Sequence, residues 1–192
     1  MVLGRRLCQR RFIRGGGTFP QRHPIRRNRL VLVRCPEGTV YEPVRTEPGQ
    51  YLGRPVYHEG QVVLLLVDFQ KAEILILLFR ETDGTTEPLA VLPLSIVTDC
   101  YNLMLEVSPL LLTRSAHDNR FQILWPERRD FAIEDHEYFA FLEENKLYTW
   151  VWYEDPDYRE DVLVRDYDTG EVLERIPGNL RTMPDGQHWL LV

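Results

Sequence analysis

The chain has 192 residues, of which 44% are hydrophobic and 27% charged, and its net charge is −6. This composition is typical of a globular protein that can bury one good core or two small ones. The longest apolar runs, VVLLLV and ILILLF, have strand length and fall far short of the roughly 20 residues that a membrane-spanning helix needs. We therefore expect no membrane association and a cytoplasmic location.

The charge is divided between two parts of opposite sign. Residues 1–34 contain ten Arg and no Asp or Glu, whereas the remaining 158 residues hold 13 Lys and Arg against 29 acids, a net charge of −16. A body this acidic repels phosphate, so any binding of nucleic acid is expected only through residues 1–34.

Residues 1–28 form an Arg-rich arm with three consecutive Gly, and such a segment cannot bury enough apolar surface to fold alone. We expect the arm to be disordered and residues 29–192 to form a single domain. Three interpretations of the arm stay open: an RNA-binding extension, an organellar presequence, and a solvated tail without a role, which is favoured.

The sequence offers no recognisable metal or cofactor site. Cys8, Cys35 and Cys100 are widely spaced, and none belongs to a CxxC motif, which fits unpaired thiols in a reducing compartment. The N-terminus lacks the apolar segment of a secretory signal. No two His have HxH or HExxH spacing, and no glycine-rich nucleotide motif occurs. We expect neither a metal nor a cofactor.

From residue 30 onward the sequence consists of short apolar segments separated by turns, and helical periodicity is scarce. A short helix is expected only at 95–102. The expected strands, in chain order, are residues 30–34, 39–44, 54–58, 62–69, 73–79, 88–94, 101–107, 109–114, 121–125, 130–134, 137–142, 147–153, 161–166, 171–176, 179–183 and 188–192.

Four of these strands have an Arg at or next to their last residue and lead into a turn. Three of the turns contain a Gly within four or five residues of the Arg, and Gly reaches the positive φ that a tight turn requires. In the remaining turn we expect Asn119 to take this conformation. The Arg residues and their turn residues are Arg34 with Gly38, Arg80 with Gly84, Arg114 with Asn119, and Arg165 with Gly170.

The spacing of these hairpins predicts an architecture. A mean spacing of roughly 44 residues with four strands per unit is typical of propeller blades. Units at 54–94, 101–134 and 137–176 leave two strands at each end of the chain, which together make a fourth. We therefore predict an all-β fold of antiparallel hairpins in about four repeated units, a small β-propeller-like ring closed by both termini. The alternative is a β-sandwich or an open meander barrel.

Closure of the ring has a consequence for the C-terminal strand. Residues 188–192 would pair or stack near residues 30–34, and Trp189 would be a core residue. We therefore expect this strand to be buried although it ends the chain.

The segment YEDPDYRED, residues 153–161, is the most polar stretch between two apolar strands. It offers carboxylates to a cation or to a basic partner, but it also reads as a charged hairpin turn begun by Asp-Pro, which is the favoured interpretation. Trp125 and Tyr153 end their strands near a Pro and are the aromatic residues expected at a rim. The candidate binding residues are Trp125, Tyr153, Asp155, Asp157 and Asp161.

No GxSxG elbow and no recognisable Cys–His pair is present, so we assign no catalytic residue. We expect a non-catalytic, acidic interaction scaffold that binds a protein. Two alternatives stay open. One is a hydrolase or lyase for a sugar or other small polar substrate, with strand-end carboxylates as acid and base. The other is an RNA-associated protein that acts through its N-terminal arm.

Overall fold

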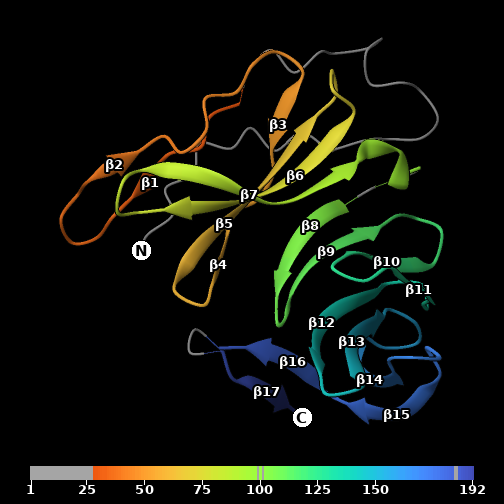
Figure 1. The fold of residues 1–192 in the computed structure, drawn as a ribbon. Coiled ribbons are helices and arrows are strands. Elements are labelled where there is room, and N and C mark those ends of the chain that lie inside the picture. Colours follow the sequence, from red (N-terminus) through yellow and green to blue (C-terminus); the bar gives the residue numbers. More distant parts are fainter. Residues whose placement is uncertain (1–27, 99, 101, 184–185) are drawn as a thin grey trace. The chain divides into compact units, whose positions relative to one another are not determined.

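The structure is a computed structural model that describes residues 28–98, 100, 102–183 and 186–192 (Figure 1). These residues form antiparallel sheets, which confirms the predicted all-β class. Their one helical element is a 3-10 turn, Leu94–Ile96, in place of the helix expected at 95–102. No helix in the described part of the chain is long and apolar enough to cross a membrane. The expected Arg-rich arm, residues 1–28, lies outside the described residues except for Asn28.

The chain divides into two compact units, one up to Leu105 and one from Glu106. Strand β8 (Asn102–Val107) runs across the division. The first unit contains β1 (Leu32–Val33), β2 (Val40–Tyr41), β3 (Gln50–Leu52), β4 (Val56–His58), β5 (Gln61–Asp68), β6 (Glu73–Arg80) and β7 (Thr85–Pro93). The second contains β9 (Leu110–Ser115), β10 (Arg120–Trp125), β11 (Arg129–Ala132), β12 (Glu137–Glu143), β13 (Lys146–Tyr153), β14 (Arg159–Asp166), β15 (Val172–Pro177), β16 (Asn179–Thr182) and β17 (His188–Leu191).

The sheet of the first unit is built around β5, which is buried along residues 62–68 because its apolar side chains point to both faces. The strand order is β3–β5–β6–β7, and β4 also pairs with β5. The sequence missed the three-residue strand β3. The β1–β2 hairpin packs on this sheet through the fully buried Leu32 and through Tyr41, whose ring meets Phe79 edge-on at 5.4 Å.

The second unit contains the sheet β12–β13–β14–β15, and the sheet β11–β10–β9–β8 belongs to it except for part of β8. Both are four-stranded meanders, and their strands lie within two or three residues of the predicted ones. A shared apolar cluster joins them, in which Phe121 of β10 stacks on Phe139 of β12 at 5.3 Å. The cluster contains Leu111, Phe121, Ile123, Phe131 and Leu147, with Ile133, Phe139, Leu142 and Tyr167 packed against it.

The turns after the four Arg residues have the predicted backbone. Gly38, Gly84 and Gly170 have φ of 75°, 71° and 76°, and Asn119 has φ of 53°. The hairpins nevertheless occupy different places in their sheets. Arg80 is the last residue of β6 and Arg165 the next-to-last of β14, and in chain order each of these strands is the penultimate one of its sheet. Arg114 is the next-to-last residue of β9, which in chain order is the second strand of its sheet. The repeated turn is therefore a local solution to chain reversal and does not mark one fixed position in each unit.

The two ends of the chain do not share a sheet among the described residues, and the expectation that Trp189 is a core residue is wrong. Strands β16 and β17 pair with each other as a two-stranded sheet, and so do β1 and β2. Trp189, expected in the core, is 50% exposed, and its indole N–H donates to the Gln187 side chain at 3.0 Å. Alternation along a strand does not specify which of its two faces is covered by other residues. The sequence therefore could not predict that the Trp189 side chain is exposed.

The β16–β17 hairpin is joined to β12 through His188, whose imidazole stacks on Phe141 with 3.7 Å between ring centroids. Burial lowers the pKa of His188 below its ordinary value of 6.5, although the charge of Glu143 opposes the shift. The unfolded imidazole therefore takes up its proton at a higher pH than the folded one. The contribution to stability is present above pH 6.5 and is lost as the pH falls through the lowered folded value.

We predict that the β17 amides lose protection from hydrogen exchange between about pH 7 and pH 5, after correction for the intrinsic exchange rate. In His188→Gln, which cannot titrate, protection should be independent of pH over this range. Constant protection in the wild-type chain would show that the imidazole does not hold the hairpin.

Candidate functional site

One end of the sheet β12–β13–β14–β15 brings two acidic segments together with the end of β15, which carries Arg175. Glu137 at the beginning of β12 lies opposite Val151 near the end of β13, and Asp161 of β14 lies opposite Pro177 at the end of β15. Residues 134–136, residues 154–160 and the end of β15 therefore meet. We call this region the acidic end. Its seven carboxylates are Glu134, Asp135, Glu154, Asp155, Asp157, Glu160 and Asp161, against the two guanidinium groups of Arg159 and Arg175.

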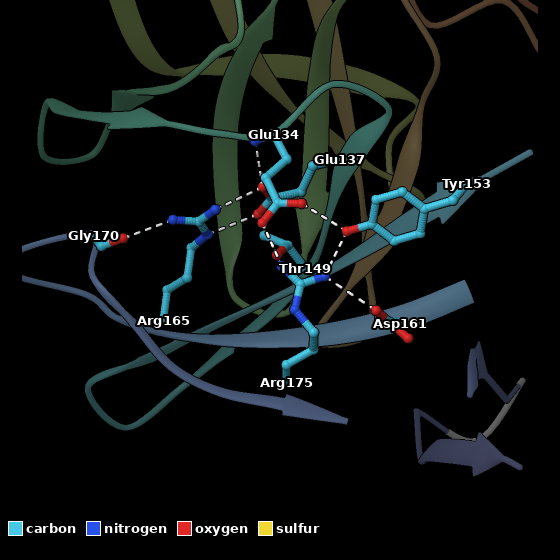
Figure 2. Close-up of polar contacts among 8 residues, drawn as sticks. All are labelled: Glu134, Glu137, Thr149, Tyr153, Asp161, Arg165, Gly170 and Arg175. Atoms are coloured by element: carbon cyan, nitrogen blue, oxygen red, sulfur yellow. Dashed lines mark hydrogen bonds and ion pairs between the residues drawn. The ribbon is translucent and has the colours of Figure 1, made fainter. Parts of the chain in front are cut away.

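Arg175 of β15 organises the inner part of the acidic end (Figure 2). Its Nη2 donates to Glu134 Oε1 at 2.5 Å, and its Nη1 donates to the Tyr153 hydroxyl at 2.5 Å and to Asp161 Oδ2 at 3.1 Å. The Tyr153 hydroxyl donates in turn to Glu134 Oε2 at 2.7 Å. Arg159 covers the Tyr153 ring, 4.3 Å from its centroid. Tyr153 and Asp161, two predicted site residues, are thus held by one guanidinium.

The protonation states of this cluster are fixed by its contacts. Burial alone would raise the pKa of Glu134, but the hydrogen bonds from Tyr153 and Arg175 outweigh it and lower that pKa. Burial and the bond to Glu134 raise the pKa of the Tyr153 phenol, which stays protonated at neutral pH. A general acid needs a carboxyl with a raised pKa. Glu134 is instead an ionised carboxylate neutralised by its neighbours, so the cluster is built for ion pairing.

A second ion pair lies deeper in the same sheet (Figure 2). The Glu137 side chain is completely buried, and Arg165 donates to both of its oxygens, from Nε at 2.8 Å and from Nη2 at 2.7 Å. The Thr149 hydroxyl and the Glu134 N–H also donate to this carboxylate, at 2.5 and 2.7 Å. Arg165 Nη1 donates to the Gly170 carbonyl at 2.8 Å. Through the hydrogen bond from the Glu134 N–H, the buried Glu137 carboxylate holds the backbone at residue 134 and thereby positions the Glu134 side chain in the Arg175 cluster.

The remaining predicted residues are placed apart from the Arg175 cluster. Asp155 and Asp157 are exposed in the β13–β14 loop, and neither side chain makes a hydrogen bond or ion pair within the described part of the chain. Trp125 is half-buried at the end of β10, in the other sheet. Of the five predicted residues, Tyr153 and Asp161 therefore contact the same guanidinium, and Asp155 and Asp157 lie in the exposed loop of the acidic end. Trp125 is not part of the acidic end.

The sequence missed Arg175, Glu134 and Glu160 as members of the site. Glu134 stands in the segment EDHE, which reads as a solvated loop, and Arg175 lies 41 residues further along the chain. Only the strand register brings them together. No local signal marked Arg175, because it follows Glu174 in a mostly exposed strand, where an Arg needs no partner.

Within the described residues, no group of three His, Cys, Asp or Glu side chains could hold a metal ion. No family model matches the chain, and no curated protein or solved structure is detectably similar to it. The function must therefore be inferred from the acidic end itself.

The two ion pairs predict different costs of substitution. Glu137→Gln leaves the buried Arg165 without its counter-charge and should lower the free energy of unfolding by about 3–5 kcal/mol. Glu134→Gln affects a pair that is more than one-third exposed, and should cost about 1 kcal/mol or less. Urea denaturation followed by tryptophan fluorescence measures both. Equal costs would contradict the structural role assigned to Glu137.

Proposed function

We propose that the protein is a non-catalytic interaction scaffold that binds a basic segment of a partner protein at the acidic end. The observation that carries this proposal is a group of uncompensated charges. Glu154, Asp155 and Asp157 are exposed on one short loop, and their carboxylates make no hydrogen bond or ion pair among the described residues. Such charges repel one another, and a cationic partner relieves that repulsion.

The opposite end of the sheet is also acidic, but several of its carboxylates are already used by the fold. Asp166 accepts hydrogen bonds from the backbone N–H groups of Asp168 and Thr169 in the β14–β15 turn. Asp168 accepts a bond from Asn145 at 3.1 Å and lies 3.5 Å from Arg129. Asp166 and Asp168 thus stabilise the β14–β15 turn and its contacts. Glu143, Glu144 and Glu171 at this opposite end are exposed, but they are divided between two turns, whereas Glu154, Asp155 and Asp157 lie within four residues of one loop. This clustering favours the acidic end as the surface for a partner.

The β13–β14 loop also provides an aromatic contact. Tyr158 is 65% exposed, and its hydroxyl donates to the Glu160 carboxylate, which limits the rotation of the ring. Arg and Lys side chains interact favourably with the face of a Tyr ring and with carboxylates. A tyrosine among carboxylates therefore suits a partner segment that carries Arg or Lys.

A fluorescently labelled peptide of alternating Arg and Gly tests the proposal by anisotropy at physiological salt. The triple variant Glu154→Gln, Asp155→Asn and Asp157→Asn should bind about tenfold more weakly than the wild-type chain, because three exposed charges that face the peptide are lost.

A matched control removes the same charge from the opposite end. The triple variant Glu143→Gln, Glu144→Gln and Glu171→Gln should bind within about twofold of wild type. Equal losses in the two triple variants would show that only the net charge matters and would contradict a specific site. Absence of measurable binding to the wild-type chain would contradict the scaffold itself.

We also propose that the scaffold has a propeller-like arrangement of its repeated units. The support is the succession of multi-stranded meanders, each of which places most consecutive strands side by side, as in propeller blades. For a compact chain beginning at Asn28, small-angle X-ray scattering should give a radius of gyration of about 15 Å. A value several ångströms larger would indicate an open arrangement of the units and contradict the ring.

A further inference from the structure

A shallow hollow of about 370 Å³, wide open to solvent, lies between the acidic end and the β16–β17 hairpin. Its wall comes from the beginning of β14, the β15–β16 junction and the last residue of β17. Gly178 forms this junction with φ of 135°, and a Cβ atom there would lie 2.7 Å from the Leu191 carbonyl oxygen. The glycine therefore allows β17 to approach closely. The lining residues are Tyr158, Arg159, Glu160, Gly178, Asn179, Arg181 and Leu191.

Two acceptors in this wall lack donors. Glu160 Oε2 and Asn179 Oδ1 are both buried, and neither has a hydrogen-bond partner among the described residues. The other oxygen of Glu160, Oε1, accepts the hydrogen bond from Tyr158. A buried carboxylate oxygen without a donor is unfavourable. Two such acceptors in one hollow match a ligand group that carries several N–H donors and a positive charge.

The hollow also contains a positively charged side chain, Arg181, that can bind an anionic group of a ligand. Arg181 of β16 is exposed and makes no hydrogen bond or ion pair within the described residues. Arg159 is already engaged, because it covers the Tyr153 ring and donates to the Asp155 carbonyl at 3.4 Å. Arg181 is therefore the guanidinium that remains for an anionic group. A purely cationic ligand would leave this charge uncompensated and would be repelled by it.

We propose that this hollow binds a free α-amino acid as its zwitterion. The ammonium group donates to Glu160 and Asn179, the carboxylate accepts from Arg181, and the side chain lies against Leu191 and the ring of Tyr158. The hollow shares Tyr158 with the surface proposed for a basic partner. Its charged groups, Glu160 and Arg181, differ from the loop carboxylates Glu154, Asp155 and Asp157, so the variants of either set test one proposal without the other.

Calorimetric titration of the full chain with L-leucine and two analogues tests the charge requirement. The analogue 4-methylpentanoate lacks the ammonium group, and L-leucinol lacks the carboxylate. L-Leucine should bind saturably, and each analogue should bind about tenfold more weakly or not at all. Binding of L-leucinol as tight as that of L-leucine would overturn the zwitterion proposal. So would the absence of saturable L-leucine binding.

Two variants assign the binding to this hollow. Glu160→Gln and Arg181→Gln should each weaken L-leucine binding about tenfold. Glu144→Gln and Arg128→Gln remove the same charges outside the hollow and should leave binding unchanged. Glu160 and Arg181 could instead pair with each other in solution. In that case L-leucine does not bind, the two substitutions show a coupling energy in a double-mutant cycle, and the proposal is overturned.

Discussion

Glu137 carries a negative charge into the interior of the second unit, and much of that unit is arranged to accommodate it. A buried carboxylate is tolerated only when it is paired and hydrogen-bonded. Arg165 supplies the charge, while Thr149 and the Glu134 backbone supply further donors. One side chain therefore connects β12, β13, β14 and the segment before β12. Through the Gly170 carbonyl, Arg165 extends this connection to the β14–β15 turn.

The Arg175 cluster depends on this arrangement. The Glu134 backbone is held by Glu137, and the Glu134 carboxylate contacts Tyr153 of β13 and Arg175 of β15. Arg175 neutralises the inner carboxylates of the acidic end, and the exposed acids of the β13–β14 loop stay uncompensated. The fold thus separates acids that stabilise the sheet from acids that face solvent. This separation, more than the net charge, favours a binding surface.

The backbone conformation of the turns could be predicted from the sequence because it depends on few neighbouring residues. A positive φ at Gly38, Gly84, Asn119 and Gly170 follows from residue type within a single hairpin, and the strand boundaries followed from the same turns. The position of each hairpin within its sheet was less readable, because the same turn serves any two antiparallel neighbours. The error at Trp189 has the same origin: its strand was recognised, but the face that neighbouring strands leave uncovered was not.

The sequence by itself determined the all-β class, most strands, the turn residues and the acidic character of residues 153–161, since each depends on local periodicity, residue conformation or composition. Tertiary structure decided which acids act together. Arg175 reaches Glu134 across 41 residues, and Glu160 lines the same hollow as Leu191, 31 positions later. Such contacts depend on strand register and on the packing of the β16–β17 hairpin, which no local pattern encodes. Composition could therefore indicate an acidic surface, but only the folded chain separates the paired carboxylates from the exposed ones.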